Sequence, residues 1–303
     1  MHDQDNGLGN RHGVESASRS VSTARTLLLG AALFAALVVV GYLTFVQGTA
    51  TQSIDDAAYF GRNAVGQRVT RFDRNILDHI TLGTVLLGAV VVLTVTIYRR
   101  AFRVGIIAVL GFGSAVVLAD ILKVVLPRPD LAHDEINFPE SLKGNSYPSG
   151  HTTVSMSIAL AIILIAAANW RPWLAIVAGI VEATLATGVV FAGWHRPSDA
   201  LGGVALAGLC MSVAGAAAIA TSGRRVTGHA RTLQHMFFAA IAAAAIFGVA
   251  LAVAVNDSSS GPDADAPFVL MIALVVTVAF SLTSWFAWAM RGWDWNDRGT
   301  PSG

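Results

Sequence analysis

Residues 152–194, TTVSMSIALAIILIAAANWRPWLAIVAGIVEATLATGVVFAGW, contain two long apolar runs separated by a short turn. The runs, 152–168 and 173–194, are close to the length of about 20 apolar residues with which a helix crosses a bilayer. Lipid offers the backbone no hydrogen-bond partners, so we expect both runs to be helices. The short turn around Arg171 then makes them an antiparallel pair, which returns the chain to its starting depth near residue 195.

Apolar runs of this kind recur along the whole chain of 303 residues. Hydrophobic residues make up 54% of the sequence and charged residues only 13%, against about 25% charged residues in a typical soluble domain. The further runs are 26–46, 76–98, 104–125, 200–221, 236–255 and 268–290. We therefore predict an all-α fold, a polytopic membrane helical bundle with about eight transmembrane helices.

The arginine residues predict how the bundle is oriented, because short cytoplasmic loops are rich in Lys and Arg. With eight spans, one side of the membrane receives Arg11, Arg19, Arg25, Arg99, Arg100, Arg103, Arg171, Arg224, Arg225, Arg231, Arg291 and Arg298. We expect this side to be cytoplasmic and to hold both termini of a multi-pass protein of the cell membrane. Segment 48–75 is an exception, since it is assigned to the outer side yet holds four arginines, and we expect a short interfacial helix there.

Two polar segments at the predicted outer ends of the helices are suited to binding phosphate. Ser149-Gly150-His151 opens a helix after a proline. The free N–H groups at a helix start attract anions, and a glycine lets a ligand approach the backbone. Lys123 and Arg128 close an apolar run on the same side. They supply positive charge, and a guanidinium can bind phosphate through two hydrogen bonds.

A third polar segment holds His195 and Asp199, four residues apart at the start of another predicted helix. This spacing lets the carboxylate reach one imidazole nitrogen and leaves the other nitrogen as a nucleophile. His151 is then available as a general acid for the leaving oxygen. The helical hairpin at 152–194 predicts that the two histidines lie at the same depth in the membrane.

These segments resemble the three motifs of the type 2 phosphatidic acid phosphatase (PAP2) superfamily, in its membrane lipid phosphate phosphatase branch. The second motif, Pro-Ser-Gly-His, is intact at 148–151, and the His and Asp of the third motif are present as His195 and Asp199. The first motif is shorter than in the family, with four residues instead of six between Lys123 and Arg128. The third-motif arginine is replaced by Val189.

The resemblance implies a hydrolase that needs no metal or other cofactor and that forms a phosphohistidine. The implied catalytic residues are His195 as nucleophile, Asp199 as the residue that orients it, and His151 as general acid. The implied phosphate-binding residues are Lys123, Arg128, Ser149 and Gly150, with Arg196 and Lys143 as candidates to compensate for the missing arginine. The implied substrate is a phosphorylated lipid of the outer leaflet, with polyprenyl diphosphate, phosphatidate and phosphatidylglycerol phosphate all open.

The resemblance also divides the chain. We expect a disordered cytoplasmic tail at 1–25, a six-helix PAP2-type core at 26–222, two additional transmembrane helices at 223–290 and a cytoplasmic tail at 291–303. We expect the bilayer and a lipid as partners but no nucleic acid, and the oligomeric state stays open.

Two other functions also fit the sequence. A catalytically weak protein that binds lipid phosphates would fit the replacement of the third-motif arginine by Val189. A transporter of phospholipids or polyprenyl phosphates would fit the acidic residue Glu182 inside an apolar run, together with the two additional helices.

Overall fold

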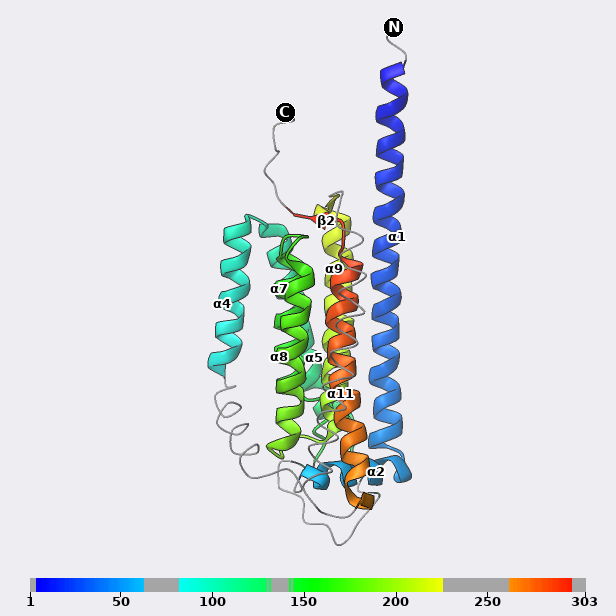
Figure 1. Ribbon diagram of the computed structural model, residues 1–303, viewed down its shortest axis with the longest axis vertical. Coiled ribbons are helices and arrows are strands. Elements are labelled where there is room, and N and C mark those ends of the chain that lie inside the picture. The colour runs from blue at the N-terminus through cyan, green and yellow to red at the C-terminus, as the bar shows by residue number, and fades with distance from the viewer. Residues whose placement is uncertain are drawn as a thin grey trace.

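The computed structural model describes residues 4–62, 82–129, 131, 142, 144–225 and 262–295. Long helices run side by side in a bundle, with one short helix across its end (Figure 1). The long helices are α1 (Gln4–Gly41), α4 (Leu82–Arg99), α5 (Phe102–Val125), α7 (Gly150–Ile165), α8 (Arg171–Phe191), α9 (Pro197–Ser222) and α11 (Pro262–Ala289). Within the described residues, five helices are long and apolar enough to cross a membrane, and α4 and α7 contribute shorter apolar helices. The protein is therefore an all-α, multi-pass membrane protein, as the sequence predicts.

Seven of the eight predicted apolar runs coincide with these helices. The eighth run, 236–255, lies outside the described residues. Residues 4–25 differ from the expectation of a disordered tail, because α1 already begins at Gln4. Extending a helix that is already formed fixes one residue for each added hydrogen bond, so a polar segment can continue the apolar helix that follows it.

The turns that are rich in arginine gather at one end of the bundle. The turn between α4 and α5 and the start of α8 lie at this end with β1 (Arg224–Arg225) and β2 (Trp293–Asp294), and the N-terminal part of α1 projects beyond it (Figure 1). These two short strands pair in antiparallel fashion, and Arg99 forms an ion pair with Asp294. The starts of α7 and α9 lie at the opposite end.

The short helix predicted after the first apolar run is α2 (Thr49–Gly61), which is joined to α1 by the π-helical turn η1 (Tyr42–Val46). It lies across the end of the bundle where α7 and α9 begin (Figure 1). Its inner side is polar, with Gln52, Asp55 and Asp56 buried. Buried polar side chains need hydrogen-bond or ion-pair partners. For Asp55 and Asp56 these partners are residues of the candidate active site described below.

Helix α9 is the most enclosed of the candidate spans. It approaches the start of α7 so closely that a Cβ atom on Gly203 would lie 2.7 Å from the backbone oxygen of Ser149. The backbone N–H of Ser149 also donates to the backbone oxygen of Asp199, at 2.8 Å. Small residues permit such contacts between membrane helices, and this contact fixes the second motif against the third.

Candidate active site

The structure brings together two histidines that 44 residues separate in the sequence. His151 lies in the first turn of α7, and His195 lies in the turn just before α9. His151 Nδ1 is 3.5 Å from His195 Nε2, and the ring centroids are 5.7 Å apart. The antiparallel pair of α7 and α8 thus returns the chain to the same end of the bundle.

Asp199 lies on the other side of the His195 ring. Its Oδ2 is 3.5 Å from His195 Nδ1, a longer distance than an ordinary hydrogen bond. The fully buried carboxylate accepts hydrogen bonds from Ser146 Oγ at 2.6 Å and from the backbone N–H of Arg196 at 3.0 Å. These donors hold Asp199 on the Nδ1 side, which leaves Nε2 of His195 facing His151.

The start of α7 combines free N–H groups with a cation. Ser149 caps the helix, and its hydroxyl accepts a hydrogen bond from the backbone N–H of Thr152 at 3.3 Å. A Cβ atom on Gly150 would lie 2.8 Å from Lys123 Nζ, so glycine makes room for this ammonium beside the helix start. Lys123 also pairs with Asp120 on α5, at 3.3 Å. Positive charge and helix N–H groups favour an anion at this position.

Arg128 is held between two carboxylates. Its Nη1 is 3.2 Å from Asp199 Oδ1, and its Nη2 is 3.5 Å from Asp55 Oδ2 on α2. Asp55 also accepts hydrogen bonds from the backbone N–H of Ser198 at 3.0 Å and from its hydroxyl at 2.5 Å. Asp55 therefore belongs to the site, although it lies outside the three motifs and sequence reasoning did not select it.

Arg196, a candidate for phosphate binding from the sequence, contacts α2 and Leu142. Its Nε donates to Asp56 Oδ1 at 2.6 Å, and its Nη1 donates to the backbone oxygen of Leu142 at 3.3 Å. The guanidinium thus fastens α2 to the start of α9. Lys143, the other candidate, lies outside the described residues. Val189 is buried in an apolar cluster that includes Phe268 of α11, so an arginine at this position would be surrounded by hydrocarbon.

A further arginine, Arg62 at the C-terminal end of α2, lies beside the third motif. The Arg62 guanidinium stacks on the Tyr59 ring, with Cζ 3.6 Å from the ring centroid. A Cβ atom on Gly193 would lie 3.0 Å from Arg62 Nε. Gly193 also has a positive φ of 77°, which favours glycine. Arg62 thus brings a positive charge to the loop at Gly193, two residues before His195.

The pKa of Asp55 is raised to about 7, first by burial and then by the negative charge of Asp199. Hydrogen bonds from Ser198 and the charge of Arg128 act in the opposite direction. Removing a carboxylate from water disfavours its charged form. Asp55 is therefore a titratable link between α2 and the site.

We expect the Asp55→Asn substitution to remove part of the pH dependence of stability. The raised pKa means that the contribution of Asp55 is fully present below about 3.8 and is lost as the pH rises through about 7. The melting temperature of the wild type in detergent should therefore fall over this range more steeply than that of the variant, which cannot ionise at this position. Asp120→Asn, at an exposed acid, serves as the control. Equal pH slopes for wild type and Asp55→Asn would contradict the assignment.

Comparison with known proteins gives a match over the segment that carries these motifs. The sequence model of the PAP2 superfamily matches residues 102–217, which run from α5 to α9. This segment is similar to the PAP2 superfamily. Over 111 residues it is 31% identical to an undecaprenyl-diphosphatase of Sulfolobus acidocaldarius. The aligned segment covers 35% of this chain and 52% of that protein. The chain thus spans about half the length of this curated relative. No solved structure matches.

The predicted site residues all lie within the PAP2 region, and α1, α2 and α11 lie outside it. The additional residues Asp55, Asp56 and Arg62 therefore come from a part of the chain that the family match does not cover. Among the described residues, no group of three or more His, Cys, Asp or Glu side chains is arranged to hold a metal ion. What the PAP2 region does assemble is a pair of imidazoles beside a buried carboxylate and several cations.

Proposed function

We propose that the protein hydrolyses a phosphomonoester or diphosphate of a lipid at the end of the bundle that carries His151 and His195. The observation that supports this most directly is the 3.5 Å approach of His195 Nε2 to His151 Nδ1, with Asp199 on the Nδ1 side of His195. A nucleophile and a general acid require this kind of mutual geometry. The substrate class includes polyprenyl diphosphate, phosphatidate and phosphatidylglycerol phosphate.

The reaction proceeds in two steps. The lone pair on His195 Nε2 attacks phosphorus, and the N–P bond forms as the P–O bond to the lipid breaks. His151 gives its proton to the departing oxygen. In the second step His151 takes a proton from a water molecule, whose oxygen attacks the phosphohistidine and releases phosphate. The Asp199 carboxylate stabilises the positive charge that His195 acquires in the first step and loses when the phosphohistidine is hydrolysed.

The negative charge of the phosphate is met by groups around the start of α7. Lys123 supplies an ammonium beside Gly150, and the free N–H groups of the first turn point outward along the helix axis. Arg128 and Arg62 add positive charge from the first motif and from α2. This set supplies the charge stabilisation that a metal ion provides in other phosphatases.

The orientation in the membrane is part of this proposal. The protein lies in the cell membrane, and the end of the bundle that is rich in arginine faces the cytoplasm together with both termini. The site opens on the outer face. This arrangement counts segment 236–255 as an additional span. This is tested in a variant whose native Cys210 is replaced by serine. A single cysteine is introduced at residue 100 or 144 and treated with a thiol reagent that cannot cross the membrane, and only the cysteine at 144 should react in intact cells.

The function is tested with purified protein, a metal chelator and a panel of the three lipid substrates. Release of phosphate without added metal is the expected result. Absence of release from every lipid would contradict hydrolysis. Retained lipid binding in that case would favour the function of a lipid-phosphate binder, which the buried Val189 at the third-motif arginine position supports.

We expect His151→Ala to slow hydrolysis of phosphatidate by about 10²–10⁴-fold, because the leaving alkoxide then lacks its proton donor. With p-nitrophenyl phosphate, whose leaving group departs without a proton, the variant should still release one equivalent of nitrophenol per site in a rapid burst. Stopped-flow absorbance measures this burst. A burst slowed as strongly as phosphatidate hydrolysis would argue against the role of His151 as general acid.

A further inference from the structure

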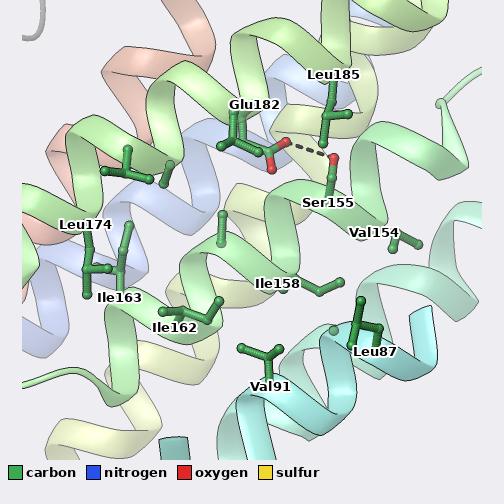
Figure 2. A pocket seen from close by; sticks show the side chains of 15 residues that line it. Leu87, Val91, Val154, Ser155, Ile158, Ile162, Ile163, Leu174, Glu182 and Leu185 are labelled. Carbon is green, nitrogen blue, oxygen red and sulfur yellow. Dashed lines mark hydrogen bonds between the residues drawn. The ribbon is translucent and has the colours of Figure 1, made fainter. Parts of the chain in front are cut away.

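A cavity of about 330 Å³ lies between α4, α7 and α8 (Figure 2), and neither His151 nor His195 lines it. We call it the α7–α8 groove. Its lining residues are Leu87, Gly88, Val91, Val154, Ser155, Ile158, Ala159, Ile162, Ile163, Leu174, Val177, Ala178, Val181, Glu182 and Leu185. This volume is within the range of about 300–1,000 Å³ of small-molecule sites.

The groove is aliphatic except for one polar pair. Ser155 Oγ donates to Glu182 Oε2 at 2.8 Å (Figure 2). Glu182 is 1% exposed and lies in the middle of the candidate span α8. Acidic residues at this depth are costly and usually serve a function. One hydrogen bond uses only part of the capacity of a carboxyl group, which leaves Oε1 for a ligand.

The polar pair lies at the end of the groove nearest the candidate active site. Ser155 follows His151 by four residues on α7, so the two side chains share one face and are separated by about 6 Å along the axis. From Glu182 the groove continues along α8 to Leu174, a distance of about 12 Å at 1.5 Å per residue. It therefore leads from about one helical turn away from His151 toward the other end of the bundle.

The rim of the groove is open to the surroundings of the bundle. Leu87, Val177 and Val181 line it and are exposed. In a bundle that spans a membrane, this outer surface is in contact with lipid hydrocarbon. A molecule that enters from this surface and reaches His151 has to combine a hydrocarbon chain with a polar head.

We propose that the α7–α8 groove binds the hydrocarbon chain of a glycerolipid phosphate whose phosphate group is held by His151 and His195. The Glu182–Ser155 pair recognises the glycerol backbone, with a protonated Glu182 carboxyl group donating a hydrogen bond from its second oxygen to an ester oxygen. This inference rests on the proposed function and narrows its substrate class. A polyprenyl chain has no oxygen beyond its phosphates, so it would leave this buried pair without a ligand partner, which is unfavourable in an apolar site.

The groove is tested by filling it. Val177 lines the groove and is 56% exposed, and Ile180 on the same helix does not line it and is 54% exposed. We expect Val177→Trp to lower kcat/KM for dioleoyl phosphatidate by at least about tenfold, with p-nitrophenyl phosphate hydrolysis unchanged. Ile180→Trp should change neither. Equal effects of the two tryptophans on phosphatidate would overturn the proposal.

The polar pair is tested by comparing two lipids. Hexadecyl phosphate has a hydrocarbon chain but no glycerol oxygens. Glu182→Leu should lower kcat/KM for phosphatidate about tenfold relative to hexadecyl phosphate, because a hydrogen-bonding site discriminates against a ligand group left unpaired. Glu182→Gln, which keeps a hydrogen-bonding group, should restore most of this preference. An equal loss on both lipids would overturn the role of the pair in recognising the glycerol backbone.

A readout without catalysis separates this proposal from the proposed function. Phosphatidate with a diazirine in its acyl chain should label α7 and α8 near Ile158, and Val177→Trp should prevent the labelling. If the wild type is labelled but does not hydrolyse phosphatidate, the proposed phosphatase activity is wrong and the proposal of a lipid-binding groove is supported. If the wild type hydrolyses phosphatidate but is labelled only outside the groove, the proposal that the groove binds the lipid chain is wrong and the proposed phosphatase activity is supported.

Discussion

Replacement of His195 by alanine is expected to reduce lipid phosphate hydrolysis by at least about 10³-fold, as loss of the nucleophile does in other covalent mechanisms. His195 Nε2 faces His151 at 3.5 Å, and Asp199 occupies the other side of the ring. No other imidazole among the described residues has this pair of neighbours. Phosphate release from the most active lipid of the panel measures the loss.

Direct detection of the phosphohistidine intermediate tests whether His195 is the nucleophile. Wild-type protein quenched in alkali during turnover of a labelled substrate should carry an alkali-stable phosphoryl group, and His195→Ala should carry none. His229→Ala is the matched control, because His229 belongs to none of the motifs. A label that persists in His195→Ala would contradict this nucleophile and point to a different residue.

The helices could be predicted from the sequence because the bilayer leaves little choice. In runs such as 104–125 and 173–194, the backbone N–H and C=O groups can form hydrogen bonds only with each other, as in a helix. These runs correspond to α5 and α8. The polar start of α1 was mispredicted, since composition alone does not show that a neighbouring apolar helix continues into it. The short helix α2 was expected as an interfacial helix in segment 48–75, but the burial of its Asp55 and Asp56 against the site was not.

The motif residues of the site could also be selected from the sequence, because His151 and His195 lie at the ends of a helical hairpin of matched lengths. Asp55 and Asp56 were missed, because their importance depends on partners more than 130 residues away, Ser198 and Arg196. A pair of adjacent acids in a short helix between spans was the available signal. Arg196 was considered for phosphate binding from its place beside His195, and only its contact with Asp56 revealed a structural role.

The largest effect on stability is expected for Arg171→Met, at the end of the bundle opposite the site. Arg171 is fully buried and donates to the backbone oxygens of Ile163 at 3.0 Å and Leu164 at 3.2 Å, near the end of α7. It also donates to those of Met290 at 2.7 Å and Trp293 at 2.5 Å, just after α11. The last carbonyl groups of a helix lack donors within the helix, so this one guanidinium serves the ends of two helices.

Methionine fills much of the same volume but donates no hydrogen bond, and each buried acceptor left without a donor costs about 1–3 kcal/mol. We expect a loss of about 3–5 kcal/mol after partial relaxation, seen as a lower melting temperature in detergent. Arg171→Lys should be intermediate, because an ammonium cannot reproduce the planar set of donors. Arg103→Met, at an exposed arginine, should have little effect. An unchanged melting temperature for Arg171→Met would mean that water replaces the guanidinium, and that α7 and α11 are held together by their apolar contacts alone.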